Sequence, residues 1–199
     1  MGLVPDHCTI SVNVSAKQLR LSDLIEMIQN AISFSKLPPE ALIIELTETA
    51  FIENSENTVG IINEIKSLGV KVSLDDFGTG YSSLSYLSRL PIDHIKIDKS
   101  FVLDLGKSEE RLAIVRAIIA MANALDITVV AEGVENLEVV RLLTIEGCDA
   151  YQGYYFSRPL SVERVNNFLS ELSPLKIARF TSFYDLGSTE SKDKMAVVN

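Results

Sequence analysis

The sequence has little of what several common kinds of functional site require. Of its 199 residues, two are cysteines, two are histidines and none is tryptophan. Cys8 and Cys148 each begin an apolar run, which favours buried small side chains in a reducing compartment over a disulfide. His7 and His94 lie far apart in the sequence and do not have the spacing of metal ligands. Two such histidines argue against a zinc site and against a Ser-His-Asp triad.

Long apolar runs and an excess of basic charge are also absent. No run reaches the roughly 18–20 residues that span a bilayer, and residues 1–10 lack the basic and apolar regions of a signal peptide. The 27 acidic residues outnumber the 18 basic ones, for a net charge of −9. Because an acidic surface repels duplex nucleic acid and anionic lipid, we expect neither as a partner. A cytoplasmic location follows as an expectation, although a longer parent protein could be membrane-anchored.

What the sequence does contain is a regular alternation of short apolar runs and amphipathic stretches. The expected strands are Cys8–Val14, Leu42–Leu46, Val70–Leu74, Ile92–Ile97, Ile127–Ala131 and Cys148–Gln152. The helices between and after them are expected to begin at Ser22, Ser55, Ser82, Ser108, Asn136 and Ser161. Six strand–helix units with short connections predict a parallel sheet with right-handed crossovers, in an α/β fold.

Each expected strand closes with a polar residue where an apolar one could have continued. In chain order these residues are Asn13, Glu45, Asp75, Lys96, Glu132 and Gln152. A doubly wound sheet and a barrel both fit the alternation, but no Gly-x-Gly-x-x-Gly turn follows any strand. In a barrel the strand ends converge on one face, where active sites form.

That face would gather carboxylates from Glu45, Asp75, Asp76 and Glu132 with the amide of Asn13. Like charges so close together would not all stay ionised without compensation. All-oxygen ligation favours magnesium, manganese or calcium over zinc and copper. Two such ions about 3.5–4 Å apart are the usual clamp for in-line attack on phosphorus. The strand ends therefore predict a two-metal site that hydrolyses a phosphodiester.

Two further features accompany these acids. Lys96 is the cation among the strand-end residues, and it could orient a metal-bound water or stabilise charge on the phosphoryl oxygens. A turn follows Asp75-Asp76 and could act as a lid or shape the metal site. Its residues are Phe77, Gly78, Thr79 and Gly80.

The motifs that hold these residues resemble those of the EAL family of bacterial cyclic di-GMP phosphodiesterases. The matching stretches are Asn13-Val14-Ser15, Glu45-Leu46-Thr47-Glu48, residues 75–84 (D-D-F-G-T-G-Y-S-S-L), residues 90–98 (L-P-I-D-H-I-K-I-D), residues 130–135 (V-A-E-G-V-E) and Gln152-Gly153-Tyr154. The likeness runs from about Thr9 to Leu172, and the D-D-F-G-T-G-Y-S-S-L string together with A-E-G-V-E is highly specific.

The resemblance implies a TIM-like (βα)8 barrel that hydrolyses cyclic di-GMP to linear pGpG with two Mg²⁺ or Mn²⁺ ions. By position, it implies a first ion held by Asn13, Glu45 and Asp75. Asp75 would also reach the second ion, which Asp76 and Glu132 would hold.

The resemblance also implies roles near the substrate for the other matched residues. The resemblance implies that Lys96 contacts the attacking water and that Gln152 and Glu135 lie on the substrate pocket. It also implies that Glu48 holds the Asp75–Leu84 loop, a region that often forms a homodimer interface.

One departure from the family concerns its Glu-Ala-Leu signature, which lies upstream of the Asn13 strand. Glu40-Ala41-Leu42 matches the letters but follows Pro38-Pro39 at a variable loop, so we interpret Glu40 as a surface residue. We therefore expect about six of the eight barrel strands, with open edges on the Asn13 and Gln152 strands that another chain could pair with. We also expect a sensor or regulatory domain upstream in a longer parent protein.

The expected domain boundaries follow from the same reading. Residues 1–173 would form the incomplete barrel, and residues 174–199 a C-terminal extension that is frayed or disordered after about residue 185, where the sequence turns polar and aperiodic. A chain that lacks one metal ligand should hydrolyse cyclic di-GMP weakly or not at all. The alternative is a non-catalytic module that binds the nucleotide or a protein partner.

Overall fold

The computed structural model describes residues 8–52, 55–80, 87, 89–171 and 195–197. The chain divides into two compact units, each described separately below. Of the described residues, those within 8–98 and 120–129 form the N-terminal unit, and those within 99–119 and 130–197 form the C-terminal unit. Among the described residues, no helix is both long and apolar enough to cross a bilayer.

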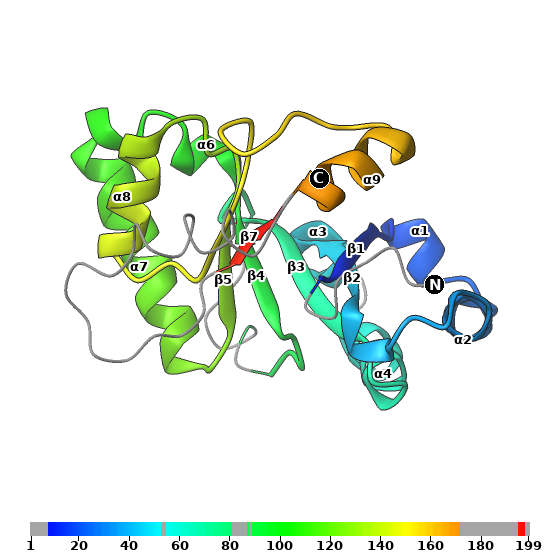
Figure 1. Cartoon of the computed structure of the whole chain (residues 1–199). Coiled ribbons are helices and arrows are strands. Elements are labelled where there is room, and N and C mark those ends of the chain that lie inside the picture. Colours follow the sequence, from blue (N-terminus) through cyan, green and yellow to red (C-terminus); the bar gives the residue numbers. More distant parts are fainter. Residues whose placement is uncertain (1–7, 53–54, 81–86, 88, 172–194, 198–199) are drawn as a thin grey trace. The chain divides into compact units, whose positions relative to one another are not determined.

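The N-terminal unit is a parallel sheet with helical connections. Its strands are β1 (Ile10–Asn13), β2 (Leu42–Thr47), β3 (Lys71–Phe77) and β4 (His94–Ile97), paired in chain order (Figure 1). Its helices are α1 (Ala16–Leu19), α2 (Leu24–Ser35), the 3₁₀ turn η1 (Pro39–Ala41), α3 (Glu48–Ile52) and α4 (Ser55–Ser67). Parallel pairing directs the carboxyl ends of all four strands to one side of the sheet.

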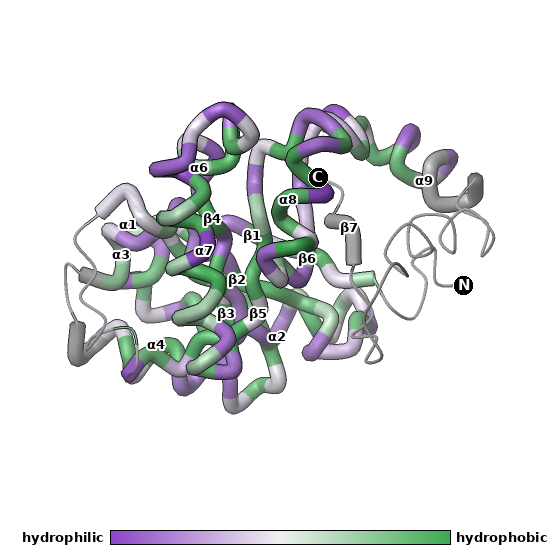
Figure 2. Tube along the Cα trace, turned by 90° about the vertical axis from the view of Figure 1, so that its left-hand side faces the viewer, coloured by the Kyte–Doolittle hydropathy of each residue, from purple (hydrophilic) through white to green (hydrophobic). Residues whose placement is uncertain are grey.

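Buried aliphatic side chains hold these elements together. Val72 and Leu74 of β3 are at most 1% exposed, and Ile95 of β4 is fully buried. On α4, Ile62 and Ile65 are also fully buried, and the tube of that helix alternates between hydrophilic and hydrophobic colours in Figure 2. Each such side chain stabilises the fold by about 1.5–3 kcal/mol, so the strand ends rest on a rigid core.

The C-terminal unit contains further strands and helices. Its elements are α6 (Lys99–Val102), η2 (Leu105–Lys107), α7 (Glu109–Ala124), β5 (Thr128–Ala131), α8 (Leu137–Ile145), β6 (Ala150–Gln152), α9 (Val162–Glu171) and β7 (Met195–Val197), with α7 and β5 lying partly in each unit. β5 pairs with β6, and β6 with β7, both in parallel. α7 and α8 lie side by side (Figure 1), and the Arg116 guanidinium donates to both carboxylate oxygens of Glu146 at 2.7 Å.

The α/β class with parallel strands is confirmed, and so are two helix caps. The Ser108 hydroxyl accepts from the Arg111 amide, and the Asn136 side chain accepts from the Val139 amide. The expected start at Ser22 is wrong, because residues 21–24 form a turn and α2 begins at Leu24. The short helices α1, α3 and α6 were not predicted, since four or five residues carry no periodicity.

Some expectations fall on parts of the chain that the structure leaves undescribed. The helix expected from Ser82 to Ser88 lies almost entirely outside the described residues, as do most of the proposed dimer loop and most of residues 174–199. Of that extension, Met195–Val197 forms β7. The predicted open edge on the Gln152 strand is wrong, because β7 pairs along β6 there.

Candidate metal and catalytic site

Strand register directs the polar strand-end residues of the N-terminal unit to one face of its sheet. Asn13 pairs with Glu45, Glu45 pairs with Ser73, and Ser73 pairs with His94. Register partners share a face, and so do residues two apart on a strand. Asp75, two residues beyond Ser73, and Lys96, two beyond His94, therefore belong to the same face as Glu45. The register therefore places Asn13, Glu45, Asp75 and Lys96 on one face of the sheet, where Asn13 is exposed.

Lys96 is the centre of this group. Its ammonium lies 2.8 Å from Glu45 Oε2 and 3.2 Å from Asp75 Oδ1. The three side chains are 6%, 7% and 13% exposed respectively, so the cluster is largely withdrawn from water. Charges in such surroundings are costly unless they are paired. The two contacts therefore fix Lys96 between the carboxylates.

A β-bulge explains how Asp75 and Asp76 can both serve this face. Leu74 pairs with Ile95 and Phe77 with Ile97, so two residues of β3 stand opposite the single Lys96 of β4. Asp76 has a φ of +56°, a left-handed conformation that Asp tolerates better than most residues. In a regular strand, consecutive side chains point to opposite faces. The extra residue removes that constraint, and it lengthens β3 beyond its predicted end at Leu74.

Asp98 adds a further carboxyl group, which the sequence did not single out. It follows β4 directly, is 9% exposed, and its amide donates to the Phe77 carbonyl at 3.4 Å. Partial burial first, then the nearby Asp75 and Asp98 carboxylates and a hydrogen bond with Asp98, raise the pKa of the Asp76 carboxyl above its ordinary value. Asp98 lies two residues after Lys96, directly after a strand, and this position was the sequence signal that could have identified it.

The charge of this cluster suits a hard divalent cation. Glu45, Asp75, Asp76 and Asp98 bring four carboxyl groups against the single ammonium of Lys96. Mg²⁺ and Mn²⁺ prefer such all-oxygen donor sets. Burial first, and then the neighbouring carboxylates, raise the pKa of Asp76, and a bound cation would oppose both effects. The residues present therefore fit the predicted kind of ion.

Glu48 fixes the loop that follows the bulge. It opens α3, is 3% exposed, and its Oε2 accepts from the amides of Gly78 and Gly80 at 3.3 and 3.2 Å. A Cβ on Gly80 would lie 2.6 Å from Glu48 Oε1, so a side chain at this position would displace the Glu48 carboxylate from the loop. The Thr79 hydroxyl donates to the Asp76 carbonyl at 2.9 Å. The loop residues 77–80 are thus tied to the segment that carries the aspartates.

The C-terminal unit presents its own strand-end pair. Glu132 follows β5 and Gln152 ends β6, one residue beyond the register pair Ala131 and Tyr151. Gln152 is 8% exposed, and its Nε2 donates to Glu132 Oε1 at 3.3 Å. The amide thus holds the carboxylate in one orientation.

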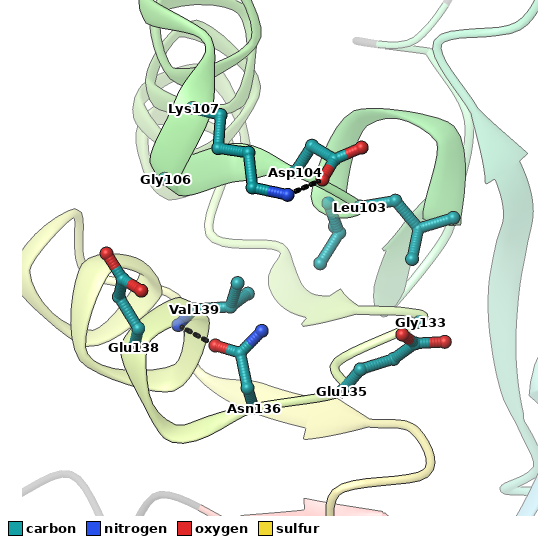
Figure 3. A pocket seen from close by; sticks show the side chains of 10 residues that line it. Leu103, Asp104, Gly106, Lys107, Gly133, Glu135, Asn136, Glu138 and Val139 are labelled. Carbon is teal, nitrogen blue, oxygen red and sulfur yellow. Dashed lines mark hydrogen bonds and ion pairs between the residues drawn. The ribbon is translucent and has the colours of Figure 1, made fainter.

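Glu135 occupies a different setting. Its side chain is exposed and lines a pocket of about 200 Å³ beside α8, shown in Figure 3. That pocket is also lined by Asp104, Lys107 and Glu138, and neither Glu132 nor Gln152 belongs to its lining. An ion pair of 2.7 Å joins Lys107 to Asp104 at its rim (Figure 3). Glu135 therefore lines this pocket, and the Gln152 side chain lies outside it.

The Glu40-Ala41-Leu42 triplet lies at the other end of β2. Glu40 is exposed within η1, before the strand begins, whereas Glu45 is its fourth residue and is 6% exposed. Because a parallel strand rises about 3.3 Å per residue, Glu40 is separated from Glu45 by most of the length of β2. The interpretation of Glu40 as a surface residue is confirmed.

Comparison with known proteins extends these observations. The family model of the EAL domain matches residues 2–159. Cyclic di-GMP phosphodiesterase NbdA of Pseudomonas aeruginosa is 42% identical over 164 residues, which are 82% of this chain and 21% of that protein. The chain spans about a fifth to a quarter of the length of the curated relatives it matches.

Solved structures match at a similar level. The PaMucR phosphodiesterase in complex with c-di-GMP has a TM-score of 0.76 and 39% identity, over 79% of this chain and 64% of that one. The manganese/cy-diGMP complex of Klebsiella pneumoniae BlrP1 has a TM-score of 0.71 and 36% identity, over 76% and 39% of the two chains. These matches confirm the predicted TIM-like barrel class. The chain belongs to the EAL-domain family of cyclic di-GMP phosphodiesterases.

Proposed function

We propose that the protein containing this chain hydrolyses cyclic di-GMP to linear pGpG in bacterial second-messenger signalling. The observation that carries the proposal is the buried cluster in which Lys96 lies between Glu45 and Asp75, with Asp76 added by the β-bulge. The MucR and BlrP1 structures to which the chain is similar hold cyclic di-GMP, the latter with manganese. Both facts support a metal-dependent phosphodiesterase over a binding module without chemistry.

Two Mg²⁺ or Mn²⁺ ions are the proposed cofactors. Bound ions of this kind polarise a phosphoryl oxygen and acidify a coordinated water. Asn13, Glu45 and Asp75 would hold one ion, and Asp75 and Asp76 would contribute to the other. Glu132 of the C-terminal unit is assigned to the second ion by the family resemblance.

The chain's own residues supply positioning and charge. Lys96 is fixed by two carboxylates, so its ammonium can donate to the attacking water or to a phosphoryl oxygen without moving far. Gln152 orients Glu132 through its amide. Glu48 keeps the loop at residues 78–80 in place beside Asp76. Such preorganisation lowers the cost of reaching the reactive geometry.

The direct test is formation of pGpG from cyclic di-GMP with Mg²⁺ or Mn²⁺ in excess, followed by chromatography. We expect metal-dependent turnover by the longer protein and much weaker turnover by the 199-residue chain, since Glu40 is exposed before β2 and does not supply the family's signature ligand. Tight binding of cyclic di-GMP by the longer protein, with no pGpG at any metal concentration, would instead establish the non-catalytic alternative.

Asp76→Asn should separate stability from metal binding. For an acid with a raised pKa, the folded state retains its proton more readily than the unfolded state, so stability decreases as pH rises from the unfolded pKa through the folded one. At neutral pH the metal-free wild type carries the full penalty, and the uncharged asparagine removes it. We expect Asp76→Asn to raise the melting temperature of the metal-free protein and to abolish most of the increase that Mn²⁺ causes.

The same measurement at acidic pH provides a control. Below the unfolded pKa of aspartate both proteins are neutral at this position, so their melting temperatures should converge. A variant less stable than wild type without metal, at neutral pH, would show that Asp76 is instead held by favourable contacts within the protein.

A further inference from the structure

β6 is a short strand whose two neighbours support different parts of it. On one side, β5 pairs with Ala150 and Tyr151, and the register stops there. On the other side, β7 pairs with every residue of β6: Ala150 with Met195, Tyr151 with Ala196 and Gln152 with Val197. Within the part of the chain that the structure describes, Gln152 therefore has its strand partner in β7 alone. Both strands lie in the C-terminal unit, as does Glu132.

The first two residues of β6 are held by other contacts besides β7. Tyr151 is buried, and its hydroxyl lies 2.8 Å from the Thr144 hydroxyl of α8 and donates to the Cys148 carbonyl at 3.2 Å. Ala150 is also buried, and its carbonyl accepts from the Cys148 thiol at 3.3 Å. Together with the β5 ladder, these contacts fix the start of the strand. Loss of β7 would therefore displace the end of β6 more than its start.

The end of β6 matters because of the residue that Gln152 contacts. Its Nε2 donates to Glu132 Oε1 at 3.3 Å, whereas N–H···O bonds are typically about 2.9–3.0 Å long and are lost by about 3.6 Å. A displacement of a few tenths of an ångström is thus enough to break this contact. The Val134 amide donates to the Gln152 carbonyl at 3.0 Å and holds the backbone at one point. The orientation of Glu132 therefore depends on how firmly the strand partner holds Gln152 at another.

We propose that β7 is a positioning strand for Glu132, because Val197, by pairing with Gln152, keeps the Gln152 amide within hydrogen-bond distance of the Glu132 carboxylate. The orientation of Glu132 stands on that contact itself. The use of Glu132 as a metal ligand rests on the proposed function. A strand of three residues makes few backbone hydrogen bonds, so its pairing opens more readily than the core. Residues 195–197 thereby set how often Glu132 is held in one orientation.

The first experiment follows the Gln152 side chain in the metal-free 199-residue chain. NMR spectroscopy measures the rate at which its side-chain amide protons exchange with water. Val197→Gly should raise this rate about fivefold, the range that strand propensities span, and a chain that ends at Lys194 should raise it further. Val162→Gly makes the same change at a 79% exposed position of α9 and should leave the rate unchanged.

The control for folding is circular dichroism of each variant. An unchanged exchange rate in folded Val197→Gly and in the folded shortened chain would overturn the proposal. If the shortened chain does not fold, the comparison of Val197→Gly with Val162→Gly decides alone.

The second experiment separates positioning from general stability. Dissociation constants for Mn²⁺ are measured by calorimetry on the longer protein that contains this chain. Gln152→Ala should weaken binding about tenfold, the usual effect of losing a group that orients a metal ligand, and Val197→Gly up to about fivefold. In a Gln152→Ala background, Val197→Gly should have no further effect, because both changes act through one contact. An equal effect in the two backgrounds would mean that β7 acts on stability alone, and the proposal would be wrong.

Failure of the proposed function is detected separately. If the unsubstituted longer protein neither binds Mn²⁺ nor forms pGpG from cyclic di-GMP, the proposed function fails. The exchange measurement needs no metal and no substrate, so it still decides whether β7 holds Gln152 against Glu132.

Discussion

Asp75→Asn should abolish turnover of cyclic di-GMP by the longer protein, with a loss of at least about 100-fold, or about 2.7 kcal/mol in the barrier. The Asp75 carboxylate lies 3.2 Å from the Lys96 ammonium, and its Oδ1 also accepts from the Asp76 amide at 3.0 Å. Asparagine keeps the shape and one acceptor but removes the charge. A proposed shared ligand of two cations would lose its ability to hold both. The measurement is pGpG formation at saturating Mn²⁺.

A matched control uses an aspartate that precedes a strand, β5, instead of following one. Asp126 is exposed and has a φ of +58°, a conformation that asparagine adopts as readily as aspartate. Asp126→Asn should therefore leave turnover and stability nearly unchanged. If Asp75→Asn keeps more than about a tenth of wild-type activity, a penalty of only about 1.4 kcal/mol, Asp75 does not bridge two metal ions.

The sequence predicted which residues share a face better than it predicted how they are held. Asn13, Glu45, Asp75 and Lys96 were found because parallel strands end at one edge, and this depends only on alternation and chain direction. The contacts of Lys96 with both Glu45 and Asp75 depend on the offset between β2, β3 and β4, which no local pattern encodes.

The β-bulge in β3 is a second feature that depends on strand pairing and could not be predicted from the local sequence. Asp75-Asp76 was predicted to lie beyond a strand ending at Leu74, because two consecutive acids interrupt an apolar run. The structure continues β3 to Phe77 by placing Asp76 at positive φ. Only pairing with β4 reveals the extra residue, so the sequence could not show that both side chains serve one face. The pairing of β7 with β6 was missed for a similar reason, since its partner lies more than 40 residues away in the chain.

The second large effect contrasts two glutamates of one segment. Glu45→Gln should reduce turnover by at least about 100-fold, a barrier increase of about 2.7 kcal/mol, while Glu40→Gln should leave it within about twofold. Glu45 is 6% exposed and lies 2.8 Å from Lys96, whereas Glu40 is exposed in η1 at the other end of β2. Both substitutions remove one charge from nearly isosteric side chains, so the difference isolates position.

Stability requires a separate readout, because Glu45 helps to neutralise a buried ammonium. Removing one partner of a buried ion pair costs about 3–5 kcal/mol when the other charge is left uncompensated, although Asp75 still contacts Lys96 in this variant. Circular dichroism and the melting temperature without metal measure that cost, and the increase in melting temperature with Mn²⁺ measures ligation. We expect Glu45→Gln to fold but to lose most of the Mn²⁺ effect. Should Glu40→Gln prove as damaging as Glu45→Gln in a folded protein, Glu40 is itself a ligand, and the assignment of the metal site to the carboxyl ends of β1–β4 is wrong.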